Sequence, residues 1–444
     1  MTDTGNGAVG DGSTGQTCVV YGASELVVGP AGWEPADQNG GHTGVSHGDL
    51  EVIEDGALVA VDGRVEVVGE TATITRGYPP ENADVALDAT GKAVVPGFVD
   101  PHTHAVFAGD RSDEFEAKLE GASYQELLAE GGGILRTVRA TREPSLETLV
   151  EALCAHLDVM LAHGTTTVEV KSGYGLDVET ECRMLEAIDV ADERHPVDLV
   201  ATFLGAHAVP EGATADAYVD RVVEHQLPAV ADQGIATYCD VFCEADVFSV
   251  GQSRRVLEAG LEYGLTPKVH AEELSHLGGA KLAAEVGAAS ADHLLYATDE
   301  DVQAMIEADV VPVLLPGTAF GLGEAYADAR GMFEAGAPVA LATDFNPNCH
   351  SRDMGFVQTL ACLEMGLTPA EALLGSTVNA AAAIGRTDGT GTLSPGGPAD
   401  LLVLEGPRYA QVAYRFDTTA VEQVLVNGTP VSTSVIANDG GETS

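Results

Sequence analysis

Positive charge is what this chain of 444 residues lacks most. Lysine and arginine number 21, only five of them lysine, against 69 aspartate and glutamate residues, so the formal net charge is −48. Binding to nucleic acid or to an anionic membrane needs a basic footprint, and the sequence therefore excludes both kinds of partner. The acidic residues are spread over the whole chain, and their mutual repulsion is screened only at high salt. We therefore expect a halophilic protein that folds in a high-salt cytoplasm.

Long hydrophobic runs are also missing. No stretch reaches the length of about 18 apolar residues that a transmembrane helix needs. Residues 1–17 have neither the basic nor the apolar segment of a signal peptide, and we expect them, like residues 438–444, to form a disordered tail. The seven cysteines are odd in number and scattered, which indicates reduced thiols and a cytoplasmic location.

Both ends of the chain are rich in short β-like segments. Two hairpin turns, Asp62-Gly63 and Asn427-Gly428, adjoin such segments. We expect residues 18–95 and 391–437 to form one small, β-sandwich-like domain. The expected strands are residues 18–21, 25–28, 57–61, 65–68, 93–95, 400–404 and 421–426.

The middle of the chain, residues 96–390, alternates strand and helix patterns. Ser145 is placed to cap one helix, and Gly164 to end it. Eight strand-like segments fit an α/β fold, a (β/α)8 TIM barrel that forms the catalytic domain. These segments are the apolar run before His102 and residues 166–171, 199–204, 237–242, 266–269, 288–291, 310–315 and 338–343.

Polar residues gather just past the ends of these strands, on the face where a TIM barrel forms its active site. Histidine is rare, at 13 of 444 residues, yet it supplies five of these ten positions. His102 and His104 are spaced i, i+2, which places both on one face of a strand. Alone, that pair would fit a polar loop better than a metal site. The ten residues are His102, His104, Tyr174, His207, Glu244, His270, Glu273, His293, Asp344 and Asn346.

Four of these residues form a candidate metal set. His102, His104, His270 and Asp344 supply three nitrogen ligands and one carboxylate. That set suits zinc or a related transition metal with one position left open for water. Lys171 lies on the second strand, whereas the carboxylated lysine of two-metal barrels lies on the fourth. We therefore expect one metal ion per chain.

Longer strings resemble the amidohydrolase superfamily and, within it, the imidazolonepropionase family, over about residues 50–430. The strings are residues 96–111 (PGFVDPHTHAVFAGDR), 170–176 (VKSGYGL), 205–210 (GAHAVP), 269–273 (VHAEE), 290–294 (SADHL), 314–318 (LLPGT) and 342–347 (ATDFNP). The resemblance implies metal-dependent hydrolysis of 4-imidazolone-5-propanoate to N-formimidoyl-L-glutamate in histidine catabolism. It also implies Zn²⁺ or Fe³⁺ as the metal and a homodimer as the assembly.

The resemblance implies how protons move in the reaction. A metal-activated water would attack the ring carbonyl, and Asp344, Glu273 and His293 would handle the protons. Which of the three is the general base stays open. Glu273 has an alternative role as a partner that fixes His270.

The family pattern also implies a substrate pocket. Arg111 matches the family's substrate arginine and would bind the propionate, although an ion pair with Asp110 or Asp113 is an alternative. Tyr174 and His207 match positions that contact the ring or the carboxylate. Glu273 and Asn346 would also contact the ligand, and Tyr124 would close the pocket.

One loop departs from the family pattern. Gly and then Ser or Thr are expected after Asn346-Pro347, but this chain has Asn348 and Cys349. These two residues would then contact the ligand through their backbone. Two rival functions stay open. One is another amidohydrolase, such as a formimidoylglutamate deiminase or a cyclic-amide hydrolase, against which Arg111 and the Tyr174 loop argue. The other is a metal-free barrel that only binds, against which the intact ligand set argues.

Overall fold

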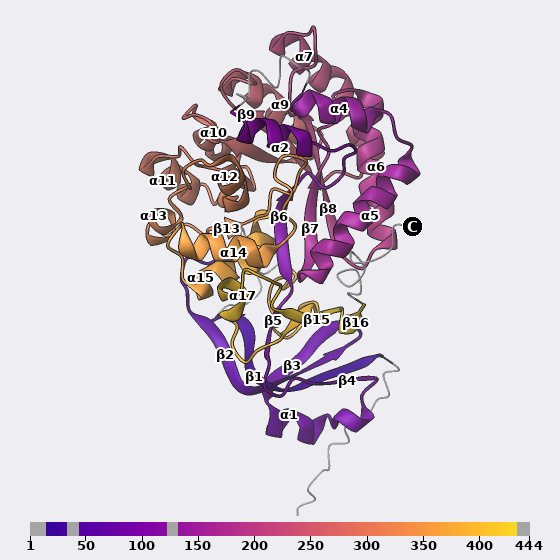
Figure 1. The fold of residues 1–444 in the computed structure, drawn as a ribbon, viewed down its shortest axis with the longest axis vertical. Coiled ribbons are helices and arrows are strands. Elements are labelled where there is room, and N and C mark those ends of the chain that lie inside the picture. The colour runs from indigo at the N-terminus through magenta and orange to yellow at the C-terminus, as the bar shows by residue number, and fades with distance from the viewer. Residues whose placement is uncertain (1–14, 33–43, 122–131, 433–444) are drawn as a thin grey trace, which may run out of the picture.

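The computed structural model describes residues 15–32, 44–121 and 132–432, which form a barrel and a separate sheet (Figure 1). Of the tails expected at residues 1–17 and 438–444, all but residues 15–17 lie outside the described residues, and Thr17 already begins a strand. Tyr124 also lies outside them.

Eight parallel strands form the barrel in the order of the chain. Thr103 pairs with Phe345, and the Asp344 N–H donates to the His102 carbonyl, so the last strand closes onto the first. The expected (β/α)8 barrel is confirmed. The strands are β6 (Phe98–Thr103), β7 (Thr165–Lys171), β8 (Asp198–Ala206), β9 (Tyr238–Cys243), β10 (Thr266–Ala271), β11 (Ser290–His293), β12 (Val311–Leu314) and β13 (Ala340–Leu341).

Helices surround these strands (Figure 1). In α5, Ser145 accepts a hydrogen bond from the Thr148 N–H, and Gly164 follows the helix with φ +96°, as its sequence predicts. The helices are α2 (Ser112–Leu119), α4 (Ile134–Arg142), α5 (Leu146–Ala162), α6 (Val178–Arg194), α7 (Ala215–Arg221), the π-helical turn η2 (Val222–Gln226), α8 (Leu227–Gln233), α9 (Val250–Glu262), α10 (Gly279–Val286), α11 (Asp299–Glu307), α12 (Pro316–Leu322), α13 (Ala329–Glu334), α14 (Met354–Leu363), α15 (Pro369–Gly375), α16 (Val378–Ala383) and α17 (Gln411–Tyr414).

The second sheet joins both ends of the chain, as Figure 1 shows by its indigo and yellow strands. Its order is β16-β15-β14-β5-β1-β2-β3, with β4 paired to β1. The elements are β1 (Thr17–Pro30), β2 (Leu50–Val61), β3 (Arg64–Glu70), α1 (Thr71–Gly77), the 3₁₀ turn η1 (Pro80–Asn82), β4 (Val85–Asp88), β5 (Ala93–Pro96), β14 (Leu401–Leu404), β15 (Val421–Val426) and β16 (Thr429–Val431).

Two tight hairpin turns and a shared core stabilise this sheet. Asp62-Gly63 and Asn427-Gly428 both have positive φ at the two central residues, which is the type I′ geometry that favours these residues. Cys18, Val94 and Leu425, from distant strands, belong to one buried cluster. The sheet therefore has a buried core of its own.

The barrel interior has an apolar end and a polar end. At the amino-terminal end of the strands, Val200, Tyr238 and Ile384 belong to one buried cluster, and α16 packs against β6. Toward the carboxyl ends, the buried side chains are polar and charged, among them Lys171 and Asp240.

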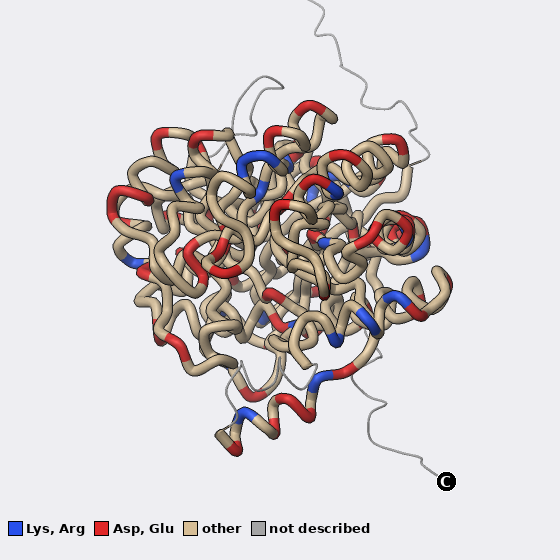
Figure 2. Tube along the Cα trace, turned by 90° about the horizontal axis from the view of Figure 1, so that it is seen from above, with Lys and Arg blue, Asp and Glu red and all other residues tan. Residues whose placement is uncertain are grey.

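Acidic residues lie on all sides of the molecule, with few basic ones among them (Figure 2). All seven cysteines are free. Among the described residues, no helix is long and apolar enough to cross a membrane.

Candidate active site

Three histidine rings and one carboxylate meet at the carboxyl ends of β6, β10 and β13. His104 Nε2 lies 3.4 Å from His270 Nε2, and Asp344 Oδ1 lies 3.7 Å from His102 Nε2 and 3.6 Å from His104 Nε2. His102 Nε2 is buried and has no hydrogen-bond partner within the described ranges. A buried polar atom without a partner is costly unless something else binds it. His102, His104 and His270 therefore fit a metal ion, and His102, His293 and Asp344 form a second possible group of ligands that shares His102.

Two carboxylates behind the site orient the rings. His102 Nδ1 lies 2.5 Å from Asp292 Oδ2, and His270 Nδ1 lies 3.0 Å from Asp240 Oδ2. A carboxylate at Nδ1 favours the N–H there and leaves the Nε2 lone pair directed at the metal position. Burial also lowers the pKa of His102 well below its ordinary value, which keeps this ring neutral, as metal binding requires.

Backbone strain accompanies two of the predicted catalytic residues. His293 has φ +83° and Asp344 has φ +51°, a region that non-glycine residues avoid at a cost on the order of 1–3 kcal/mol each. Thr318 donates a hydrogen bond of 2.5 Å to Asp344 Oδ2, which leaves Oδ1 toward the histidines. Burial raises the pKa of Asp344 to about 6. The fold thus sustains strain to aim these side chains.

Glu273 and His293 face each other across the pocket, with 3.5 Å between Glu273 Oε2 and His293 Nε2. Burial, assisted by the charge of Asp344, raises the pKa of Glu273 to about 8. Asp240, not Glu273, occupies the Nδ1 side of His270. The alternative role of Glu273 as the partner that fixes His270 is therefore wrong.

Arg111 lies at the start of α2 and is buried. Its Nε donates to Glu114 Oε2 over 2.9 Å, while Glu114 Oε1 accepts from the Gly133 N–H over 2.9 Å. The alternative ion pairs are wrong, because Asp110 accepts from Ser112 and Asp113 pairs with Arg136. Glu114 thus fixes the guanidinium at the pocket wall.

Tyr174 and His207 lie beside the metal position. The His207 ring stacks on His104, with centroids 4.8 Å apart, and its Nδ1 lies 3.1 Å from the Gly173 carbonyl oxygen. Gly173 has φ +108°, and a Cβ there would lie 2.9 Å from His207 Nδ1. Only glycine fits this turn, which places Tyr174 5.3 Å from His207, centroid to centroid.

The loop after β13 forms hydrogen bonds within itself. Asn346 Oδ1 accepts from the N–H groups of Asn348 (2.7 Å) and Cys349 (3.0 Å). These are the two backbone groups expected to contact the ligand. In this structure both donate to Asn346 within the loop instead. The Cys349 thiol turns inward, 3.6 Å from the Thr343 carbonyl oxygen. Asn346 and Asn348 line the pocket, and Cys349 is absent from its lining residues.

The pocket over the metal position has a volume of about 400 Å³. It collects Arg111, Tyr174, His207, Glu273, His293 and Asn346, as the sequence predicts, together with three of the four proposed metal ligands. Sequence reasoning missed Lys118, Ile134, Phe242, Leu274, Thr318, Leu322 and Glu324 in its lining. Thr318 was included only as the last residue of the string LLPGT, without a predicted role.

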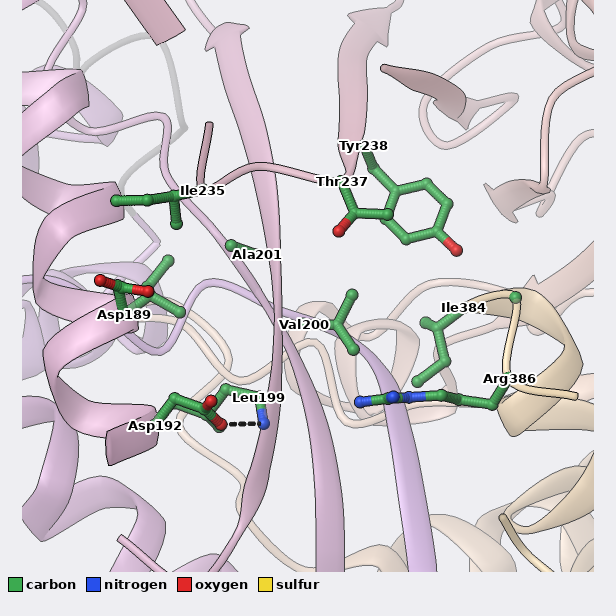
Figure 3. Close-up of a pocket in the computed structure, with 12 residues that line it drawn as sticks. Asp189, Asp192, Leu199, Val200, Ala201, Ile235, Thr237, Tyr238, Ile384 and Arg386 are labelled. Atoms are coloured by element: carbon green, nitrogen blue, oxygen red, sulfur yellow. Dashed lines mark hydrogen bonds between the residues drawn. The ribbon is translucent and has the colours of Figure 1, made fainter. Parts of the chain in front are cut away.

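Another cavity of about 400 Å³ lies at the opposite, amino-terminal ends of β8 and β9 (Figure 3). Asp192 accepts from the Leu199 N–H there, and Arg386 extends beneath Val200. None of the predicted site residues lines this cavity.

Sequence reasoning also missed four of the five charged residues inside the barrel, and it assigned no role to the fifth, Lys171. Glu169, Lys171, Asp240, Lys268 and Asp292 are all fully buried. The available signal was charge within otherwise apolar strands, as in Tyr238–Cys243.

Comparison with known proteins agrees with this geometry. The chain is similar to the imidazolonepropionase of Haloarcula marismortui, with 64% identity over 94% of this chain and 96% of the relative. The imidazolonepropionase of Geobacillus kaustophilus is 48% identical over 88% and 92%. The amidohydrolase family profile matches residues 248–431. The structure of E. coli guanine deaminase matches with a TM-score of 0.69 and 18% identity, over 94% of this chain and 99% of that one, which shows the fold alone.

Proposed function

The chain belongs to the imidazolonepropionase family of the amidohydrolases, and we propose that its histidine-lined pocket is where it hydrolyses 4-imidazolone-5-propanoate to N-formimidoyl-L-glutamate. The observation that carries the assignment to this pocket is the meeting of His102, His104, His270 and Asp344 beside the buried Arg111. A carboxylate-bearing substrate needs a fixed cation near the reacting centre, and the pocket has one.

One metal ion, Zn²⁺ or Fe³⁺, is proposed for this site, held by His102, His104, His270 and Asp344. When bound, such an ion lowers the pKa of a water at that position toward about 7 and polarises a carbonyl. Lys171 is engaged by Glu169 and Asp240 in the barrel interior, which supports a single ion because that amine is not directed at a second metal position.

The reaction consumes one water. Its oxygen bonds to the ring carbonyl carbon, the carbon–nitrogen bond breaks, and the ring nitrogen leaves with a proton. We assign the uptake of the water's proton to Asp344, whose Oδ1 faces the histidines. Glu273, with a pKa raised to about 8, is protonated at neutral pH and is placed with His293 to donate to the leaving nitrogen.

The remaining pocket residues are proposed to hold the substrate. Arg111 would bind the propionate, while Tyr174 and His207 would contact the ring beside the metal. Asn346 would border the formimidoyl end, while Asn348 would line the pocket wall beside Lys118. Contacts from Tyr124 and Cys349 stay predictions.

The test combines metal analysis with turnover. Protein purified in molar salt should hold one metal per chain and consume imidazolonepropionate, while Asp344→Asn should lose turnover. Formimidoylglutamate should not be deiminated. Two metals per chain would contradict the single-ion proposal, and a metal-loaded protein that acts only on formimidoylglutamate would overturn the substrate.

A cytoplasmic homodimer is the proposed working form. The seven free cysteines support a reducing compartment. Leu363, Tyr414 and Phe416 are exposed around a groove whose lining has Arg408 as its single charged member among the described residues. An apolar face without acidic groups is where two strongly acidic copies repel least. Sedimentation in molar salt should show a dimer that Tyr414→Asp dissociates.

A further inference from the structure

A single ammonium group lies behind both oriented histidines. Lys171 Nζ is 2.9 Å from Asp240 Oδ2 and 3.9 Å from Asp292 Oδ2. Asp240 is the carboxylate at His270, and Asp292 is the carboxylate at His102. One lysine on β7 therefore touches both carboxylates that set the two rings, and all three charged side chains are fully buried.

The lysine is itself fixed. Its Nζ donates to Glu169 Oε1 over 2.8 Å, and the same oxygen accepts from the Thr202 hydroxyl. Glu169 Oε2 in turn accepts from the Thr103 N–H over 3.3 Å, next to His102 in the chain. The ammonium is therefore held in place from β6, β7 and β8, and it is fully buried.

We propose that Lys171 is a positioning residue for the metal centre, which holds Asp240 and Asp292 so that His270 and His102 present Nε2 to the metal. The inference rests on the proposed metal site and deepens it. A buried carboxylate without a cation is unstable, so Asp240 would turn from His270 if the ammonium were lost, and Asp292 would keep only Lys268, at 3.8 Å. Partners of metal-ligating histidines are worth about 10- to 100-fold in metal affinity when they are removed.

Charge and orientation make opposite predictions for this residue. If Lys171 acted only through its positive charge, its removal would strengthen the binding of a cation nearby. If it acts by orienting the two carboxylates, its removal weakens the binding of the metal. The direction of the change therefore decides between the two roles.

Lys268 offers a matched control, because it is equally buried but differently placed. Its Nζ lies 2.7 Å from Ser290 Oγ and 3.4 Å from the carbonyl oxygens of Pro101 and Ala383. It approaches only one of the two carboxylates, Asp292, at 3.8 Å. Replacing either lysine by methionine removes one buried ammonium, but only Lys171 links both histidines.

The experiment measures transfer of Zn²⁺ from the loaded protein to a competing chelator, together with the visible absorption of the Co²⁺-substituted protein. We expect Lys171→Met to weaken metal binding by about 10- to 100-fold and to change the Co²⁺ spectrum. Lys268→Met leaves the ion pair between Lys171 and Asp240 intact, so it should weaken metal binding less than Lys171→Met does. A folded Lys171→Met protein with unchanged or tighter metal binding would overturn the proposal.

A second variant keeps the proposal testable if Lys171→Met does not fold. Asp240→Asn leaves the ammonium in place and removes the negative charge that lies between Lys171 Nζ and His270 Nδ1. It should weaken metal binding too, and wild-type affinity in this variant would also count against the proposal. If the wild-type protein itself held no metal, the proposed function would fail instead.

Discussion

Lys118 Nζ donates a hydrogen bond of 2.6 Å to Asn348 Oδ1, which links α2 to the loop after β13 at the wall of the pocket. Asn348 stands where the family pattern has glycine, so its side chain makes a contact that glycine would lack. Lys118 is one of only five lysines, and burial together with the nearby Arg111 charge lowers its pKa. Two cations therefore border one pocket in a very acidic protein.

From this pair we predict that Lys118→Met raises KM for imidazolonepropionate by about 10- to 150-fold with kcat changed little, because a charge-assisted contact to the propionate is worth about 1.5–3 kcal/mol. Asn348→Ala should raise KM by a smaller factor, since the ammonium remains. Steady-state kinetics of both variants, with Lys281→Met on the exposed surface as the control, tests this. Equal KM values for Lys118→Met and wild type would refute it.

Glu273 gives a prediction on the chemical step. Glu273→Gln removes the proton but keeps the shape, so kcat should fall by about 10²–10⁴-fold, the usual contribution of a general acid. Metal content should stay at the wild-type value, because Glu273 is not among the proposed ligands. A kcat within threefold of wild type, or a loss of metal in this variant, would remove Glu273 from the catalytic step.

Sequence reasoning placed the strand ends well, because a buried strand followed by a histidine is a local pattern. This local pattern predicts each barrel strand. It also predicts which side chains meet over the metal position. The contacts behind the site could not be predicted in this way. Asp292 orients His102 from 190 residues away, and Lys171 depends on strands that pair only in the folded barrel. The loop of Asn346 likewise redirects backbone N–H groups that its sequence leaves open.

Glu371 gives a prediction on acid stability. Burial opposes ionisation, but hydrogen bonds from Arg330 and from the Thr368 N–H outweigh it and lower the pKa of Glu371. A depressed pKa means that this stabilisation is present above the unfolded value near 4.3 and is lost as the pH falls through the folded value. Glu371→Gln should therefore lower Tm at pH 7, and its difference from wild type should shrink below about pH 4.

The control for this prediction is Glu179→Gln, which changes an exposed carboxylate at the start of α6. Exposed ion pairs contribute about 0–1 kcal/mol, so this variant should follow the wild-type curve. Thermal melts across pH measure both. A Tm difference for Glu371→Gln that stays constant down to pH 3 would show that the lost stability is not that of the ionised carboxylate.

Because the net charge is −48, we expect the stability of the fold to depend strongly on the salt concentration. At 0.1 M salt the screening length is about 10 Å, so neighbouring surface carboxylates repel one another, and at 1 M it falls to about 3 Å. We expect Tm to rise steeply between these concentrations of KCl and more slowly above them. Sucrose at matched osmolality is the control, because it is excluded from the surface but screens no charge. If sucrose raised Tm as much as KCl, or if Tm were the same at 0.1 M and 2 M KCl, repulsion between the acidic residues would not be what limits the stability of this fold.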